Sequence, residues 1–371
     1  MPDGPLLHLI EPASWRAALS EGVLRPPSLA DVGFIHLSTP EQAHLPAERL
    51  FPGRRDLALL VVDPQRLRDP VRWEPGVPED PASMRFPHLH GPLPTTAVTA
   101  VVPYRPPAPP VLPGPDDPLG RALALQLSVA VRRAADVRDV PGGVAVSDAR
   151  FPRSRDDNRL LLSSPVDADT VEDTAAGMGW FARAATLRFP GADDVAHELA
   201  QRGWSVEEIV LMGRPATQVP GGERAEVVPQ EVVHPLWERS WRELLGSGRD
   251  DVVAELVDRE FRNDAVVAVT DVVVREEGLV VAAGQLRVDG GTAAVDSVLT
   301  DGAARGHGHA GAVLARILTL AADAGCDLVV LEAAGDDWPR HWYARAGFTE
   351  LGSTWDVFAP AQTGANTDSS R

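Results

Sequence analysis

The chain contains 371 residues, more than one ordinary domain needs, and its 44% hydrophobic and 24% charged residues predict a soluble globular protein. All 35 basic residues are arginine, and the 53 acidic residues leave a net charge of −18. Because lysine is absent, a Schiff-base enzyme and a phosphate-binding P-loop are excluded. The single cysteine, Cys326, excludes an internal disulfide and a cysteine-based zinc cluster.

Hydrophobic periodicity and turn residues predict three segments of strands and helices. The first combines short strands and loops with one early helix, and its clearest elements are the helix Ala13–Glu21 and the strands Leu57–Asp63 and Ala97–Val102. In the second, helices are expected at Leu119–Ala134, Asp167–Gly177 and Asp193–Arg202, and strands at Gly143–Asp148, Arg159–Ser164, Ala182–Phe189 and Trp204–Met212. In the third, helices are expected at Pro235–Leu245, Asp250–Arg262, Ala310–Ala324 and Trp338–Ala346, and strands at Ala265–Val274, Leu279–Val288, Thr292–Thr300, Cys326–Glu332 and Phe348–Phe358. This alternation favours an α/β fold throughout.

A proline-rich stretch at 105–118 is the clearest domain boundary, because it can form neither helix nor central strand. We therefore expect domains at 1–104, 119–218 and 225–360, and a disordered polar tail at 361–371. The linker shows no hydrophobic pattern that would tie it to either side, so the N-terminal domain is expected to be separable.

Charge and apolar runs indicate the kind of partner. Residues 225–360 carry 11 arginines and 23 acidic residues, which favours a cationic small molecule as substrate, although acidity also serves solubility. No basic stripe is visible in the sequence, so a nucleic-acid partner is not expected. No run approaches the ~20 apolar residues that span a bilayer, and no signal sequence is visible, so a cytoplasmic protein without a membrane partner is predicted.

The strongest local signal is a strand followed by a glycine-rich turn and an apolar helix. The turn has the spacing Arg305-x-x-Gly308-x-Ala310. A helix start leaves backbone N–H groups unpaired and carries partial positive charge, so glycines there let a pyrophosphate approach. The spacing is not the dinucleotide fingerprint, and alone it is equally typical of a tight turn.

A second motif, Tyr343-x-x-x-Gly347-Phe348, follows at the matching distance. Together the two motifs resemble the GNAT family of N-acetyltransferases over residues 225–358. The resemblance implies a mixed-sheet acetyltransferase fold, acetyl-CoA as cosubstrate, and Tyr343 as the acid that protonates the departing thiolate. It assigns phosphate binding to Arg305, Gly306, His307, Gly308, His309, Ala310 and Gly311, and pantetheine binding to the backbone of Val298, Leu299 and Thr300. One departure is that the loop 301–304 is a residue longer than common, which affects the pantetheine register.

The sequence does not determine which group acts as the general base. Glu332 and Asp296 are candidates, each with a solvated carboxylate at a strand end as the alternative, and a water chain would also serve. His307 and His309 supply too few ligands for a metal without a third partner, so no metal is expected. Trp237 and Trp241, one helical turn apart, would form an acceptor wall in the family, but core packing is favoured.

The middle segment repeats part of the C-terminal pattern. His197-Glu-Leu199-Ala200-Gln-Arg-Gly203-Trp204 parallels His341-Trp-Tyr343-Ala344-Arg-Ala-Gly347-Phe348. Leu199 stands at the tyrosine position, and SSPVDAD replaces the phosphate turn. We interpret this as a degenerate acetyltransferase-like domain that binds no CoA, with coincidence as the alternative.

The first segment carries a different set of motifs. They are Leu7–Ile10, Arg25–Ser28, Gly33–Ser38, Val71–Glu74 and Phe86–Leu93. Over about residues 6–103 they resemble the bacterial domain-of-unknown-function family 952, which implies a small α+β fold related to ADP-ribosyltransferases. The family tends to have tyrosine where His90 stands. A polar cleft is one hypothesis, and histidines that cap backbone groups are the favoured alternative. The side chains that would line the cleft are His8, His36, Ser38, Arg72 and Glu74.

The predicted function is acetyl-CoA-dependent transfer of an acetyl group to a primary amine of a small molecule, by direct attack in a ternary complex. Two alternatives are a non-catalytic acyl-CoA-binding regulatory protein, and a main activity on NAD or ADP-ribose compounds in the N-terminal domain.

Overall fold

A computed structural model describes residues 4–76, 83–246 and 248–360. They form two compact units. Unit 1 comprises residues 4–133, 212–331 and 347–351, and unit 2 comprises 134–211, 332–346 and 352–360. These units do not follow the predicted domain boundaries, because the helix after the proline-rich stretch belongs to unit 1 and the segment with Tyr343 belongs to unit 2. The predicted tail, 361–371, lies outside the described residues.

The N-terminal part of unit 1 consists of short elements around two small apolar cores. Its helices are α1 (Pro12–Glu21), α2 (Pro27–Asp31) and α3 (His44–Leu50). Its strands are β1 (Leu6–Ile10), β2 (Val23–Leu24), β3 (Ile35–His36), β4 (Leu57–Val62), β5 (Val71–Pro75), β6 (Arg85–Leu89), β7 (Leu93–Pro94) and β8 (Val98–Tyr104). They form sheets in the orders β1-β4-β8, β3-β6-β5 and β2-β7. All six residues of β4 are buried, as its unbroken apolar run predicts.

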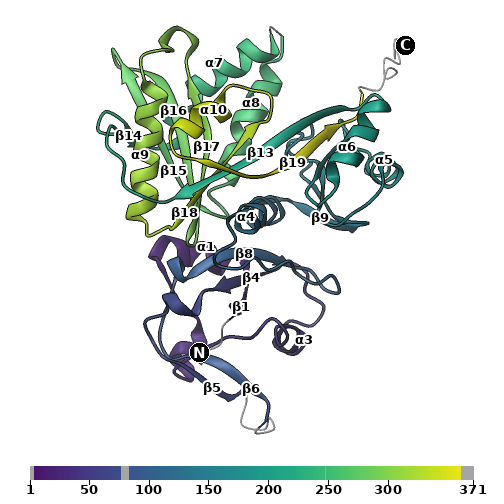
Figure 1. Ribbon diagram of the computed structural model, residues 1–371, viewed down its shortest axis with the longest axis vertical. Helices are drawn as coiled ribbons and strands as arrows, with labels where there is room; N and C mark the ends of the chain where they lie inside the picture. The colour runs from purple at the N-terminus through teal and green to yellow at the C-terminus, as the bar shows by residue number, and fades with distance from the viewer. Residues whose placement is uncertain (1–3, 77–82, 247, 361–371) are drawn as a thin grey trace. The chain divides into compact units, whose positions relative to one another are not determined.

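The C-terminal part of unit 1 is a mixed sheet with helices on both faces (Figure 1). Its helices are α7 (His234–Leu245), α8 (Asp250–Asp258) and α9 (His309–Asp323). Its strands are β14 (Glu226–Val228), β15 (Ala268–Glu276), β16 (Leu279–Asp289), β17 (Thr292–Thr300) and β18 (Leu328–Ala334). The order is β14-β15-β16-β17-β18, with antiparallel pairs except for the parallel pair β17 and β18.

Packing on the two faces fixes this sheet. A Cβ on Gly284 of β16 would lie 2.7 Å from Val313 Cγ1 of α9, so α9 approaches closely only because that position is glycine. On the other face, Trp237 of α7 packs with Val273 and Ala283 and is 6% exposed. Trp237 therefore belongs to the core, as favoured from the sequence.

Unit 2 has its own apolar core and a separate run of strands. Its helices are α5 (Ala168–Gly177), α6 (Ala192–Gln201) and α10 (Pro339–Arg345). Its strands β9 (Asp136–Val140), β10 (Gly143–Ser147), β11 (Arg159–Leu162) and β12 (Ala184–Leu187) are joined by part of β19 (Thr349–Phe358), in the order β19-β12-β11-β10-β9. The chain passes between the units within β13 (Ser205–Pro215), β18 and β19.

A buried ionic network connects the N-terminal segment to the sheet β14-β15-β16-β17-β18 inside unit 1. Arg121 of α4 (Pro118–Arg133) is 3% exposed, and its Nη1 and Nη2 atoms lie 2.8 and 2.7 Å from Asp327, just before β18. Arg66 donates to the same carboxylate at 2.8 and 2.6 Å. The Trp15 indole adds a bond of 2.7 Å to the buried Asp289.

The proline-rich stretch also contacts its surroundings. Pro113 is buried, Leu112 packs against a core cluster, and the carbonyl of Pro115 accepts from Arg121 at 3.0 Å. The expected independence of the N-terminal segment does not fit these contacts. The sequence could not show the network around Asp327, because Arg121 and Arg66 lie 206 and 261 residues from it in the chain.

Candidate functional site

The glycine-rich turn leads directly into α9. Gly306 and Gly308 have φ of +84° and +77°, the left-handed region that favours glycine. Gly308 is the N-cap of α9, and no side chain caps it among the described residues. Arg224 Nη2 donates to the His307 carbonyl at 3.1 Å and stands 3.3 Å from where a Cβ on Gly308 would be. The turn is exposed except at Ala304 and His309, with Ala310 half-buried, so its free N–H groups and guanidinium groups are available to an anion.

The strand β17 precedes the turn. Over its second half, it pairs with a neighbouring strand on one edge and not on the other, within the described residues. On the other edge, its parallel pairing with β18 covers Thr292–Ala294 within the described residues. Beyond a bulge, where Ser297 has a φ of +53°, Leu299 and Thr300 pair with β16. The predicted pantetheine residues, Val298 to Thr300, therefore lie on a strand whose other edge is open to an extended ligand.

A row of polar side chains crosses the three central strands at the bulge. Asp271 on β15 is opposite Gln285 on β16, which is opposite Asp296 on β17. Gln285 donates to Asp271 at 3.0 Å, and Arg287 pairs with Asp296 at 2.6 Å. Asp271 is 4% exposed, and burial raises the pKa of its carboxyl group. Asp271 was not among the predicted site residues, although a lone acid in the apolar strand AVTDVVV is a visible signal.

Tyr343 and Glu332 lie in unit 2, whereas the predicted CoA-binding residues lie in unit 1. Tyr343 is on α10, is 9% exposed, and lies with its ring centroid 4.8 Å from that of Trp342. Glu332 on β18 is exposed. Its charge acts on the buried guanidinium of Arg188, whose pKa burial lowers to about 10 while Glu332 and Asp356 oppose that shift.

The helix start that corresponds to the phosphate turn in the middle segment is already occupied. The Asp167 carboxylate accepts from Thr170 N at 2.8 Å at the start of α5. Leu199, at the tyrosine position, is fully buried on α6. A carboxylate at the helix start repels an anionic ligand, and a buried leucine supplies no proton.

A second concave site lies in the N-terminal part of unit 1. His8, His36 and Ser38 line a pocket of about 850 Å³, but Arg72 and Glu74 are not in its lining. Behind it, His36 Nδ1 lies 3.3 Å from His88 Nε2, and His88 Nδ1 lies 3.2 Å from Glu74 Oε2. Burial lowers the pKa of His36, and His88 and His8 lower it further. His8 also donates to the His36 carbonyl at 2.9 Å, so it caps backbone as well as lining the pocket.

Among the described residues, no helix combines the length and apolarity needed to cross a membrane.

Comparisons with known proteins place both ends of the chain in families. Residues 9–101 match the family described as "Protein of unknown function (DUF952)", and residues 232–348 match the "Acetyltransferase (GNAT) family". No curated protein matches. Residues 9–101 are thus similar to the DUF952 family and residues 232–348 to the GNAT acetyltransferases, and the second match supports acyl transfer in general.

The chain is also similar to several solved structures. A functionally unknown conserved protein from Staphylococcus epidermidis ATCC 12228 has 11% identity, covers 61% of this chain and 93% of its own, and has a TM-score of 0.50, which shows a shared fold. A GCN5-related N-acetyltransferase from Kribbella flavida has 18% identity, coverage of 67% and 97%, and a TM-score of 0.44. Protein CC0527 from Caulobacter crescentus has 35% identity, coverage of 27% and 84%, and a TM-score of 0.24.

Proposed function

We propose that the protein is an acetyl-CoA-dependent N-acetyltransferase that acts on a primary amine of a small molecule. The observation that carries the proposal is the exposed turn before α9, with two left-handed glycines, an uncapped helix start, and the adjacent cations Arg224 and Arg305. Backbone N–H groups and guanidinium groups bind pyrophosphate, the group that CoA brings. The open edge of β17 supports pantetheine in an extended conformation.

The proposed reaction is a direct attack of the neutral amine on the thioester carbonyl. The carbon–nitrogen bond forms, the carbon–sulfur bond breaks, and the phenol of Tyr343 gives its proton to the leaving thiolate. The amine's proton passes to a carboxylate or to water. Asp296 on the polar row is such a carboxylate, with its side chain 43% exposed. Glu332 remains a candidate, but its electrostatic interaction with Arg188 argues for a structural role.

The acceptor is proposed to be cationic before it loses its proton. Residues 225–360 hold −12 of the chain's net charge of −18, which attracts small amines and disfavours nucleic acid. A non-catalytic acyl-CoA-binding protein would not need Tyr343, so turnover separates the two proposals. The test is a panel of small amines incubated with acetyl-CoA, with free thiol and acetylated product both measured. Thiol release with no acetylated amine from any member of the panel would contradict the proposal.

A second candidate function rests on the N-terminal pocket. A carboxylate, a buried histidine and a pocket histidine are aligned through Glu74, His88 and His36, an arrangement that can move a proton. NAD and ADP-ribose compounds are the ligand class of this alternative, which comes from the resemblance of the N-terminal segment to family 952. Calorimetric titration of the full chain with NAD or ADP-ribose tests this, with His36→Asn expected to weaken binding. The matched control is His44→Asn, because His44 is exposed and lies outside the pocket lining.

A further inference from the structure

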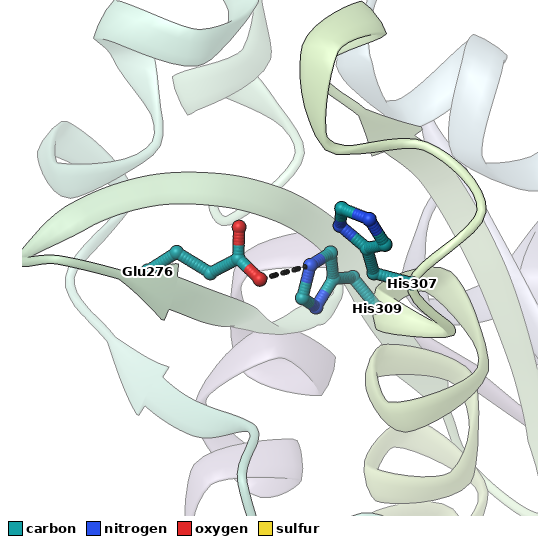
Figure 2. A group of neighbouring side chains, drawn as sticks. All are labelled: Glu276, His307 and His309. Atoms are coloured by element: carbon teal, nitrogen blue, oxygen red, sulfur yellow. Dashed lines mark ion pairs between the residues drawn. The ribbon is translucent and has the colours of Figure 1, made fainter.

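Three side chains that could bind a metal meet at the start of α9. They are Glu276 at the end of β15, and His307 and His309 on either side of the N-cap Gly308 (Figure 2). One potential ligand atom from each lies within 4.8 Å of the other two. From the sequence, no metal was expected at the two histidines because a third ligand was not visible. The structure supplies it from a strand that lies more than 30 residues earlier in the chain.

The buried side chain of His309 has unsatisfied polar atoms. Its side chain is 2% exposed, and neither ring nitrogen has a hydrogen-bond partner among the described residues. Its Nε2 atom lies 2.8 Å from Glu276 Oε1. This distance makes an ion pair, but the contact does not have the geometry of a hydrogen bond. A buried polar nitrogen without a hydrogen bond is costly, and a cation placed beside it removes that cost.

The spacing suits a small transition-metal dication. Two ligands of a tetrahedral zinc ion at bond lengths of about 2.1 Å lie roughly 3.4 Å apart. The contact between His309 and Glu276 is 2.8 Å, and no pair of the ligand atoms is separated by more than 4.8 Å, so rotations of the exposed Glu276 and His307 side chains suffice. Two imidazoles and one carboxylate are a borderline donor set that suits Zn²⁺.

The backbone around Glu276 is held in place. Arg275 donates to Glu226 at 2.6 Å and to the Gly278 carbonyl at 3.2 Å, which braces the hairpin between β15 and β16. On the other side, Arg224 holds the His307 carbonyl. The hairpin that carries Glu276 and the turn that carries His307 are thus both held by arginines that are not themselves ligands.

We propose that Glu276, His307 and His309 form a binding site for one divalent transition-metal ion of the Zn²⁺ class, with a fourth position open to water or a ligand oxygen. The site shares its two histidines with the turn proposed to bind pyrophosphate. A bound dication replaces the negative charge of Glu276 with net positive charge. On the proposed function, the metal-loaded protein therefore binds acetyl-CoA more tightly than the metal-free protein.

The test uses the untagged full chain after removal of metal with a chelator. Zn²⁺ is titrated by calorimetry, and Co²⁺ is added as a spectroscopic probe of coordination number. One ion per chain is expected, with the strong visible absorption of four-coordinate Co²⁺. Loss of an outer hydrogen bond to a ligand already costs about 10–100-fold in affinity, so Glu276→Gln and His307→Asn should each cost at least about 100-fold.

Two matched variants act as controls. Glu277→Gln changes the neighbouring exposed carboxylate, and His197→Asn removes an exposed histidine elsewhere, and neither should alter metal affinity. No metal binding, or binding that Glu276→Gln and His307→Asn leave unchanged, would overturn the site. Because these readouts need no acetyl-CoA, failure of acetyl-CoA to bind the Zn²⁺-loaded protein would refute the proposed function, and the metal titration alone would decide the metal site.

Discussion

Replacing Arg121 by methionine tests the ionic network that joins the two parts of unit 1. Arg121 makes two bonds of 2.8 and 2.7 Å to Asp327 and is 3% exposed. Removing one partner of a buried ion pair costs about 3–5 kcal/mol. Arg66 remains bound to Asp327, so the lower end, about 3 kcal/mol, is expected. At about 2–4 °C per kcal/mol for a unit of this size, the melting temperature should fall by about 6–12 °C.

The assay is thermal unfolding followed by circular dichroism, with the parent and both variants under the same conditions. The matched control is Arg138→Met, because the Arg138–Asp136 pair is solvent-exposed, with side chains 67% and 51% exposed. Such a pair contributes about 0–1 kcal/mol, so the control should melt within about 4 °C of the parent. A fall for Arg121→Met no larger than that of the control would refute the reasoning.

Four further outcomes are expected. Tyr343→Phe should lower kcat by about 10- to 10³-fold with little change in acetyl-CoA affinity, whereas Tyr104→Phe, at the only other tyrosine, should keep the parent rate; equal rates for both variants would remove the acid role. Burial raises the pKa of Asp327, but the hydrogen bonds from Arg121 and Arg66 lower it by more, so the pKa lies below its usual value. The stability that Asp327 contributes is therefore present above about pH 4 and lost as the pH falls. In urea unfolding, the free energy of unfolding should fall less between pH 5 and pH 3 for Asp327→Asn than for the parent. A chain that begins at Leu119 should be less stable than the full chain, because it lacks Arg66 and the carbonyl of Thr99 that Thr292 binds, and an unchanged melting temperature would contradict this. Acetyl-CoA should bind once per chain, and a calorimetric stoichiometry of two would show that the middle segment also binds it.

Much of the local structure was predictable because local patterns determine it. The strand Thr292–Thr300 has the expected bounds, and α9 begins one residue before the expected Ala310. The apolar run and the glycine turn contain this information within a few residues. The strand Asp136–Val140 was missed because DVRDV lies at the edge of its run of strands, where none of its five residues is buried and charged residues are tolerated.

Contacts between distant residues were not predictable in the same way. Glu276 and His309 are close only because the end of strand β15 and the start of helix α9 meet in the folded chain. The bond from Trp15 to Asp289 likewise depends on packing that no local period encodes. Asp271 is an intermediate case, since its position in an apolar strand was visible but its partner Gln285 was set by strand register.

The central claim is that the turn before α9 binds acetyl-CoA. Calorimetric titration of the parent, Gly308→Asp and Gly53→Asp with acetyl-CoA tests it most directly. Gly308 and Gly53 have φ of +77° and +76°, so both variants carry similar backbone strain and the same added charge. Two unit charges about 5 Å apart at an effective dielectric of about 20 repel by about 3 kcal/mol, or roughly 100-fold in affinity. We expect that loss for Gly308→Asp and parent-like affinity for Gly53→Asp. Equal affinity for acetyl-CoA in all three proteins would contradict it.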